Sequence, residues 1–390
     1  MQSTAKAYFQ VGLLSLSHFF NDFYCNFLPI LLPILIPKLG LSLTLSGVLV
    51  MIMSFSCNVL QPFFGYFMDK HNFNSLMPII IPFGAVFICI TSLANNFIVL
   101  AILIALSGLA VSTFHPMGAG LTSKVAPDKK ISSCISLFIA GGNLGFALAP
   151  ILLVYFIDMY DLDYLPVLII PGVILGILIY LSGIGKIRFV NENVAKDMHF
   201  NLKEIVTNRP LMFLNISMGI RAWLFTALVT FLPLWTINKG YDNTLGGWIL
   251  TLYLFGSVAG GLIGGALNDK LGCKRVIFWS LILLIFPTLY LLLVQDFNLL
   301  VYISLFLSGA FAMATNPGAI VWGQKLLPDN PGMASGMMLG LSFGLGGIGT
   351  MLTSSLGEMF DLNFALIATT VLLLPAILLV YFTPSDLNEA

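Results

Sequence analysis

The sequence contains few charged residues: Asp, Glu, Lys and Arg make up 9% of its 390 residues, whereas hydrophobic residues make up 58%. A soluble globular domain carries about 25% charged residues. The stretch from Phe297 to Ala314 has almost no polar residue and so offers no polar face at helical spacing. These features disfavour a soluble all-α protein and are typical of a chain whose main solvent is the lipid bilayer.

Several functional classes lack the residues that they require. The five cysteines are scattered, without a C-x-x-C pair or a histidine at ligand spacing, so the sequence predicts neither disulfides nor a metal site. Seventeen basic residues balance seventeen acidic ones, which gives no reason to expect a nucleic-acid partner. A Walker motif and a convergent nucleophile and base are also absent. We therefore expect no enzyme activity, no cofactor and no ATP-driven transport.

Hydrophobic runs long enough to cross a bilayer occur twelve times. A helix needs about 20 apolar residues to cross a hydrocarbon core about 30 Å thick. This pattern predicts an all-α integral membrane protein. The expected spans are 10–37, 43–67, 75–94, 96–123, 131–157, 164–184, 210–238, 245–267, 274–294, 297–325, 332–358 and 362–382.

Lys and Arg are distributed unevenly between the two ends of these spans. If the N-terminus is cytoplasmic, fourteen of the seventeen lie on that side, two (Lys38 and Lys239) lie on the other, and Arg221 lies within a span. The positive-inside rule then places both termini in the cytoplasm. The first span is too long for a signal-peptide core and lacks a small-residue cleavage pattern, so we expect it to remain as the first helix.

The second half of the chain repeats the first at an offset of about 200 residues. Gly-Tyr-Phe-Met-Asp-Lys at 65–70 returns as Gly-Ala-Leu-Asn-Asp-Lys at 265–270, and Pro116 returns as Pro317. A register held by Gly, Pro and Asp indicates two copies of one helical unit. We predict two pseudo-symmetric six-helix bundles and a linker: an N-terminal bundle at 1–183, a cytoplasmic linker at 184–209 and a C-terminal bundle at 210–390.

Asp22 is the one acidic side chain near the middle of a predicted span. It lies about 18 Å into the first helix at 1.5 Å per residue. A carboxylate at that depth costs at least about 2.5 kcal/mol and usually faces the protein interior in a functional role. We expect Asp22 to carry a coupling proton and His18, one turn away on the same face, to tune or relay it. The alternatives are a structural carboxylate and a neutral histidine bonded to a backbone carbonyl.

Arg221 is a lone basic residue in the middle of the seventh span, and its repeat partner is Asn21, next to Asp22. A guanidinium stays charged and offers a planar fork to a carboxylate, phosphate or phosphonate. Arg221 either anchors an anionic substrate or neutralises Asp22 as a buried pair, and the two roles are compatible. We predict substrate-binding roles for Arg221 and Asn21.

A histidine and its repeat partner each precede a proline inside a span. His115 precedes Pro116 in the fourth span, and Asn316 precedes Pro317 in the tenth. Such a proline leaves a backbone carbonyl unpaired, which is tolerated only where the helix faces protein or water. We predict that His115 and Asn316 also contribute to substrate binding.

A glycine and a carboxylate four residues apart share one helix face at the cytoplasmic end of the second and eighth spans. Glycine permits close approach of another helix, and the carboxylate can cap a helix N-terminus or meet the following lysine. An ordinary charged loop is the alternative, but the repetition favours a conformational latch. The predicted latch residues are Gly65, Asp69, Lys70, Gly265, Asp269 and Lys270.

These features together resemble the major facilitator superfamily, whose members have twelve spans in two sixes and a G-x-x-x-D-K motif after spans 2 and 8. Short motifs are further similar to the fosmidomycin-resistance type of efflux protein: SHFFND at 17–22, FHP at 114–116, GGNLG at 141–145, RAW at 221–223 and TFLP at 230–233. That family has a carboxylate after the His-Pro of helix 4, and this chain has Met117 there. The resemblance implies that helices 1, 4, 7 and 10 line a central cavity and that the latch stabilises an outward-facing state.

The resemblance also implies a function. We expect a secondary active transporter in the bacterial cytoplasmic membrane, a proton-coupled antiporter that exports a small anionic or amphiphilic drug or metabolite by alternating access. Its partners would be a small-molecule substrate, protons and the lipid bilayer, and the fold suffices as a monomer. The alternatives are an importer or uniporter of an organic acid or metal-chelating metabolite and a lipid flippase.

Overall fold

The computed structural model describes residues 4–70, 73–127, 130–187, 207–294, 296–328 and 331–384. Within these ranges the chain is helical and has no strand. Twelve segments are long and apolar enough to cross a membrane, from Ala5–Leu39 to Leu362–Phe382. The predicted all-α membrane fold with twelve spans is thus confirmed.

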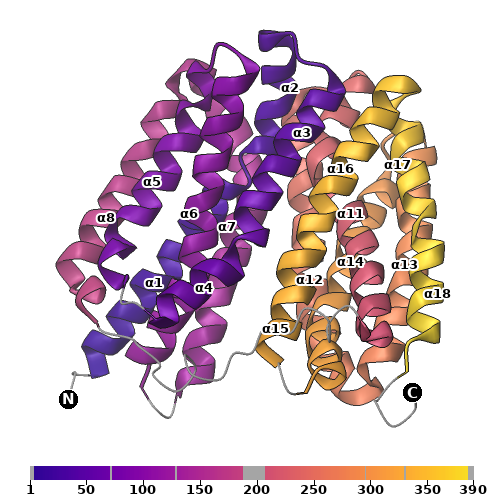
Figure 1. Ribbon diagram of the computed structural model, residues 1–390. Coiled ribbons are helices and arrows are strands. Elements are labelled where there is room, and N and C mark those ends of the chain that lie inside the picture. The colour runs from indigo at the N-terminus through magenta and orange to yellow at the C-terminus, as the bar shows by residue number, and fades with distance from the viewer. Residues whose placement is uncertain are drawn as a thin grey trace. The chain divides into compact units, whose positions relative to one another are not determined.

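The described chain divides into two compact units, and unit 1 contains Met1–Leu39 and Phe55–Met198. In this unit α1 packs along α7, and α5 packs against both α6 and α8 (Figure 1). The helical elements of unit 1 are α1 (Thr4–Cys25), α2 (Leu28–Leu39), η1 (Phe55–Val59), α4 (Gln61–Lys70), η2 (Asn74–Leu76), α5 (Met77–Cys89), η3 (Ile90–Leu93), α6 (Phe97–Val125), α7 (Ile131–Tyr160), η5 (Leu162–Leu168), α8 (Ile169–Ser182) and η6 (Ile184–Lys186).

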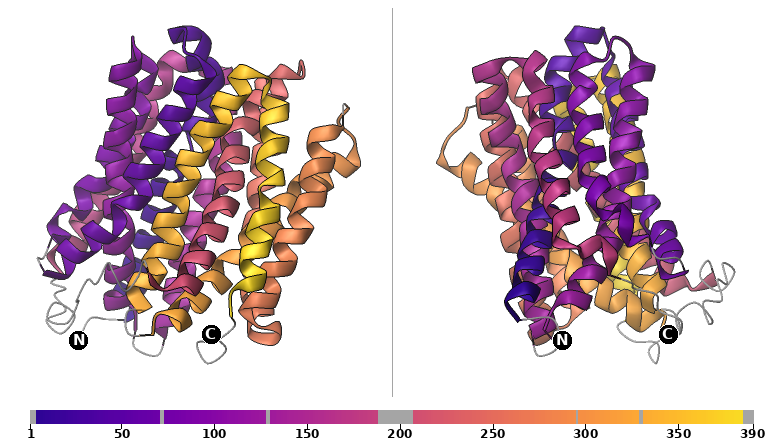
Figure 2. Two further views of the ribbon diagram at one scale, coloured as in Figure 1. Left: turned by 45° about the vertical axis from the view of Figure 1, so that its right-hand side comes forward. Right: turned by 90° about the vertical axis from the view of Figure 1, so that its left-hand side faces the viewer.

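Unit 2 contains Gly40–Ser54 and His199–Ala390. In this unit α12 packs along α14, while α16 packs against both α3 and α11 (Figure 2). The helical elements of unit 2 are α3 (Leu43–Ser54), α11 (Arg209–Asn238), α12 (Asn243–Leu271), α13 (Cys273–Leu293), α14 (Leu299–Leu326), α15 (Pro331–Gly336), η7 (Met337–Leu341), α16 (Ser342–Met359), α17 (Leu362–Val371) and α18 (Leu373–Phe382).

The first half of the second span, α3, groups with unit 2 through its packing on α16. A Cβ atom at Gly47 of α3 would lie 1.9 Å from Ser354 Oγ, so only glycine allows this approach. Most of the predicted linker at 184–209 lies outside the described residues, since 188–206 are not described. The predicted division into bundles at 1–183 and 210–390 therefore stays a prediction.

The helices that carry His115 and Asn316 begin with the same cap. Asn96 accepts a hydrogen bond from the backbone N–H of Val99 at 3.0 Å, and Asn298 accepts one from Val301 at 3.1 Å. An asparagine at this position pairs a backbone donor that the helix itself leaves unpaired. The caps start α6 and α14 at nearly the same distance before His115 and Asn316. The two residues therefore lie at corresponding positions of the two helices.

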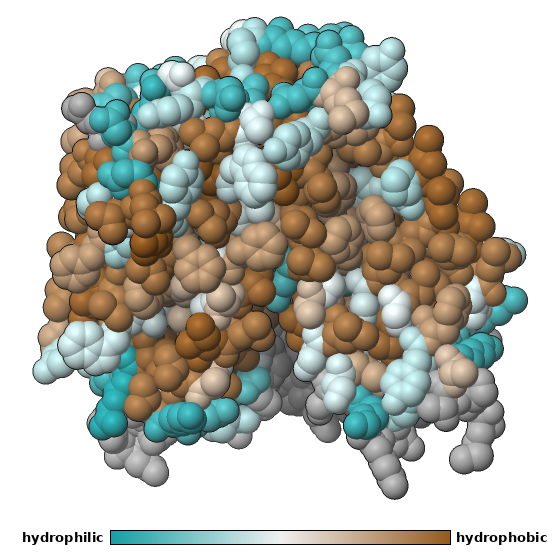
Figure 3. Space-filling model, turned by 180° about the vertical axis from the view of Figure 1, so that it is seen from behind, coloured by the Kyte–Doolittle hydropathy of each residue, from teal (hydrophilic) through white to brown (hydrophobic). Residues whose placement is uncertain are grey.

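Large apolar side chains cover much of the surface. Leu181 and Leu262 are each 72% exposed, and Phe286 is 66% exposed. Figure 3 shows hydrophobic residues over the middle of one face and hydrophilic residues gathered toward its ends. A soluble monomer rarely exposes apolar surface on this scale, whereas a bilayer solvates it.

Three glycines on α12 face the backbone of α14. A Cβ atom at Gly260 would lie 1.9 Å from the carbonyl oxygen of Ala310, whereas a Cβ atom at the next residue, Gly261, would meet nothing within 4 Å. We expect Gly260→Ala to lower the free energy of unfolding by about 1–3 kcal/mol, because the two helix backbones must separate. Gly261→Ala is the matched control and should be neutral or stabilising. Equal unfolding curves for the two variants in SDS titrations would contradict this packing.

Candidate functional site

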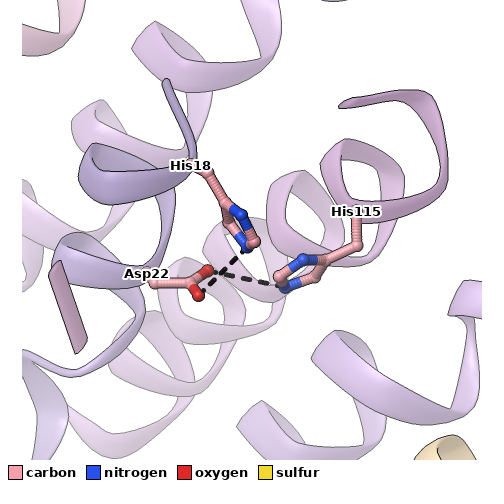
Figure 4. Close-up of side chains that lie close together, drawn as sticks. All are labelled: His18, Asp22 and His115. Atoms are coloured by element: carbon pink, nitrogen blue, oxygen red, sulfur yellow. Dashed lines mark ion pairs between the residues drawn. The ribbon is translucent and has the colours of Figure 1, made fainter. Parts of the chain in front are cut away.

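Unit 1 brings three titratable side chains together from two helices (Figure 4). His18 and Asp22 lie one turn apart on α1, with His18 Nε2 at 3.3 Å from Asp22 Oδ2. His115 on α6 places its Nε2 atom 3.5 Å from the other carboxylate oxygen, Oδ1. Their side chains are 9%, 16% and 28% exposed, respectively. We call His18, Asp22 and His115 the triad.

Hydrogen bonds fix the orientation of two triad members. The Nδ1 atom of His18 lies 2.8 Å from the carbonyl oxygen of Phe138, and because a carbonyl only accepts, Nδ1 donates. The other ring nitrogen, Nε2, therefore faces Asp22 with either a second proton or a lone pair. The Asn21 amide donates to Asp22 Oδ1 at 2.9 Å. His18 thus has one fixed partner and one contact within the triad, and Asp22 has one fixed partner and two.

Three rings of unit 1 pack around His18. His18 stacks on Phe138 with ring centroids 4.1 Å apart and an interplanar angle of 28°. It also lies 5.6 Å from the ring of Phe114 and 5.1 Å from that of His115. One ligand atom from each triad residue lies within 4.8 Å of the others, so this group has the residue types and spacing to hold a metal ion, which the cysteine pattern did not indicate.

Glycines of α7 make room for this cluster. A Cβ atom at Gly142 would lie 2.4 Å from His18 Nε2 and 2.6 Å from Asp22 Oδ2. A Cβ atom at Gly145 would lie 2.0 Å from the Phe19 carbonyl oxygen, so α1 and α7 meet almost backbone to backbone. The GGNLG motif at 141–145 did not indicate in sequence that Gly142 borders the triad directly.

Gly142→Ala is expected to lower proton-driven transport roughly 10-fold or more. The added methyl group must displace His18 or Asp22, and a hydrogen bond to a charged group contributes about 1.5–3 kcal/mol. Gly12→Ala on α1 is the matched control, because a Cβ atom there meets nothing within 4 Å. Initial rates in proteoliposomes measure the effect, and equal rates for the two variants would show that Gly142 does not position the triad.

Unit 2 buries Arg221 of α11 completely. One guanidinium nitrogen, Nη2, donates to Oδ1 of Asn316 on α14, and Nη1 lies 3.8 Å from Met313 Sδ. The guanidinium carbon lies 5.3 Å from the centre of the Phe343 ring, within cation–π range. The predicted residues Arg221 and Asn316 are therefore in direct contact.

Two polar atoms near this arginine lack a partner. Within the described part of unit 2, Arg221 has no acidic side chain within 4 Å, and its Nε atom makes no hydrogen bond. The hydroxyl of the fully buried Tyr253, which interacts electrostatically with Arg221, also has no partner in this part of the chain. An unpaired buried donor costs about 1–3 kcal/mol, so the region is suited to a ligand that accepts hydrogen bonds. Tyr253 carried no signal in its apolar sequence context.

The two units repeat one polar contact with different residues. In unit 1, Asp22 of the first helix contacts His115, the residue before Pro116. In unit 2, Arg221 contacts Asn316, the residue before Pro317. Each unit therefore pairs an ionisable side chain with a polar group beside a helix proline, an acid in unit 1 and a base in unit 2.

Two further predictions, the pairing of Asp22 with Arg221 and the conformational latch, are not tested by the structure. Asp22 and Arg221 belong to different units, so their pairing stays a prediction. Among the latch residues, a Cβ atom at Gly65 would meet Pro116 at 3.7 Å and one at Gly265 would meet Pro317 at 3.9 Å, both ordinary contacts. The side chains of Asp69 and Lys70 lie outside the described residues, and those of Asp269 and Lys270 are exposed. The latch also stays a prediction.

Sequence comparisons identify related proteins. The Major Facilitator Superfamily matches residues 14–247 and 214–389. The fosmidomycin resistance protein of Escherichia coli (strain K12) is 26% identical over 360 residues, which cover 89% of this chain and 86% of that protein. The uncharacterized MFS-type transporter YfnC of Bacillus subtilis (strain 168) is 25% identical over 390 residues, covering 96% and 92% of the two chains. The predicted resemblance to the fosmidomycin-resistance type is thus confirmed.

Solved structures share the fold at low sequence identity. A bacterial homolog of the human lysosomal transporter Spinster, in an inward-facing and occupied conformation, has a TM-score of 0.79 and 13% identity, covering 98% of this chain and 97% of that chain. The nucleoside transporter NupG has a TM-score of 0.75 and 14% identity, with 98% and 99% covered. At this identity the likeness concerns the fold alone.

Proposed function

Because the chain belongs to the major facilitator superfamily of secondary transporters, we propose that it exports a small organic anion in exchange for protons. The resemblance to the fosmidomycin resistance protein supports export, since that relative is named for resistance to a compound. The excess of Lys and Arg on one side supports a position in the bacterial cytoplasmic membrane with both termini in the cytoplasm. Alternating access would carry substrate and protons in turn.

The fully buried Arg221 carries the substrate part of this proposal. A buried charge without a counter-charge is costly, and no acid of the described part of unit 2 lies within 4 Å to supply one. A carboxylate, phosphate or phosphonate would accept bonds from the guanidinium fork and from Tyr253. The Phe343 ring beside the guanidinium offers an apolar surface for the carbon skeleton of an amphiphilic anion. Asn316 holds the guanidinium in place.

The triad carries the proton part of the proposal. If Asp22 is ionised and His18 is neutral, two acceptor atoms face each other at 3.3 Å, because His18 Nδ1 holds the only ring proton. A proton between them removes this repulsion. Histidine titrates near physiological pH, so this proton can be bound and released as the site faces each side of the membrane in turn. His115 approaches the second oxygen and offers another acceptor or donor.

The repeat relates the two halves of the mechanism. Arg221 corresponds to Asn21 and Asn316 to His115, and in transporters built from repeats the substrate site lies at the repeat interface. We propose that both charged clusters serve one transport site and that anion and proton binding exclude each other. Exclusive binding of two ligands is the requirement for antiport.

Proton-driven uptake into inside-out vesicles tests this function. Vesicles that contain the protein should accumulate the transported anion when their interior is made more acidic than the medium. Fosmidomycin is the first probe, because a relative is named for resistance to it. Vesicles without the protein are the control. Accumulation driven by the opposite gradient would indicate an importer, and accumulation without any gradient dependence would refute proton coupling.

A further inference from the structure

We propose that the triad of His18, Asp22 and His115 also binds a divalent transition-metal ion of the zinc, cobalt or nickel class, and that this ion blocks transport. The proposed block of transport rests on the proposed function, but the proposed metal binding does not. Binding itself follows from the geometry of unit 1 and can be measured without a substrate.

The separations between ligand atoms come close to those of a tetrahedral site. Zinc–nitrogen and zinc–oxygen bonds are about 2.0–2.2 Å, so adjacent ligand atoms in a tetrahedron lie about 3.3–3.5 Å apart. In the triad, Asp22 Oδ2 lies 3.3 Å from His18 Nε2, and the other carboxylate oxygen, Oδ1, lies 3.5 Å from His115 Nε2. With one ligand atom taken from each residue, the three atoms lie within 4.8 Å of one another, so small rotations of the side chains bring one carboxylate oxygen and both imidazoles to tetrahedral spacing.

Partners outside the triad orient its ligands for a metal. The Phe138 carbonyl accepts the Nδ1 proton of His18, which leaves the lone pair of Nε2 directed at the site. The Asn21 amide donates to Oδ1 of Asp22, the oxygen nearer His115, and leaves Oδ2, the oxygen nearer His18, available. Backbone-carbonyl and amide partners of this kind fix the ring orientation and raise the basicity of metal ligands. Figure 4 shows both imidazoles directed toward the carboxylate.

The donor set selects the class of ion. Two imidazole nitrogens and one carboxylate suit zinc, cobalt and nickel, whereas calcium and magnesium prefer oxygen ligands. Three protein ligands also leave one coordination position for water. Metal binding requires unprotonated ligand atoms, so a bound ion excludes the coupling proton from the triad. Transport should therefore stop when the ion binds.

Two cysteines near Asp22 are a second possible set of metal ligands. The sulfur atoms of Cys25 and Cys57 lie 3.8 Å apart, and Cys57 interacts electrostatically with Asp22. A thiolate pair is itself a ligand for soft ions. Measured binding must therefore be assigned to imidazole and carboxylate or to sulfur before it supports the triad.

The test uses the full chain, purified in detergent with a histidine-free affinity tag and stripped of metal by EDTA. Zn²⁺ titrated into the wild-type protein should bind at one ion per chain in a calorimeter. His115→Gln and Asp22→Asn should each weaken binding at least about 10-fold, the size of effect expected when a metal site loses a supporting group. The double variant Cys25→Ser, Cys57→Ser should bind as the wild type does.

Co²⁺ identifies the ligands through its visible spectrum. Bands typical of nitrogen and oxygen ligation, without a thiolate charge-transfer band, would support the triad. A thiolate band, binding that survives His115→Gln unchanged, or no binding to the stripped wild-type protein would overturn the proposal. Folding of each variant is checked by its thermal unfolding temperature in detergent.

Transport measurements separate this inference from the proposed function. Zn²⁺ should inhibit proton-driven transport by the wild type, and EDTA should restore it. If the protein transports with proton coupling but binds no metal, the metal site alone is refuted. If the protein binds one metal ion per chain but shows no proton-driven transport, the proposed coupling is refuted and the metal site is supported.

Discussion

Asp22→Asn is expected to abolish proton-driven transport while substrate exchange without a gradient continues. Asparagine has nearly the shape of aspartate but neither binds nor releases a proton at physiological pH. The variant keeps hydrogen-bonding atoms for His18 and His115, so the α1–α6 contact should persist. We expect gradient-driven uptake to fall to the level of vesicles without the protein, because no proton is exchanged. Uptake and counterflow are measured in the same vesicles.

The control for this variant is Asp163→Asn. Asp163 forms a surface pair with Lys38 at 3.7 Å and its side chain is 77% exposed, so the change should leave transport intact. Undiminished gradient-driven uptake by Asp22→Asn would show that the triad does not carry the coupling proton. Loss of counterflow as well as uptake would assign Asp22 to substrate binding or folding instead.

Arg221→Ala should weaken binding of the anionic substrate about 10- to 100-fold. Charge-assisted hydrogen bonds contribute about 1.5–3 kcal/mol each, and the guanidinium has an unpaired Nε as well as its terminal nitrogens. Arg221→Lys keeps the charge but loses the planar fork, so its affinity should lie between those of the wild type and the alanine variant. Tyr253→Phe, which removes only the unpaired hydroxyl, should lose less. Binding to purified protein is measured by calorimetry.

The matched control is Arg209→Ala, which removes an exposed arginine at the start of the same helix. A purely structural Arg221 predicts a different result. If it only neutralised Asp22, the alanine variant would unfold at lower temperature and Asp22→Asn would restore its stability. Full affinity for the anion in Arg221→Ala would exclude its role as the substrate anchor.

Much of the fold could be predicted because membrane helices have a strong sequence signal. Each span must be about 20 residues long and apolar, and prolines such as Pro116 and Pro317 mark the repeat. The packing of α3 on α16 could not be predicted in this way. It depends on close approach at Gly47, and glycines that contact a helix look the same in sequence as glycines with open space beside them, such as Gly261.

The candidate site was predictable residue by residue but not contact by contact. His18 and Asp22 share a helix face by their spacing, and the repeat selected His115 and Asn316. Sequence could not show that His115 completes the triad, since that contact depends on how α1 packs against α6. Gly142 and Tyr253 were missed for the same reason: their roles come from neighbours on other helices.

Substrate-induced proton release tests the central claim most directly. Purified wild-type protein in weakly buffered detergent solution should release about one proton for each anion bound. If a bound proton prevents anion binding, thermodynamic linkage requires that a bound anion displaces the proton. A pH indicator records the release during a substrate titration. We expect none from Asp22→Asn, although that variant still binds the anion. Release that is unchanged in Asp22→Asn, or no release from the wild type at saturating substrate, would contradict proton–anion exchange through Asp22 and Arg221.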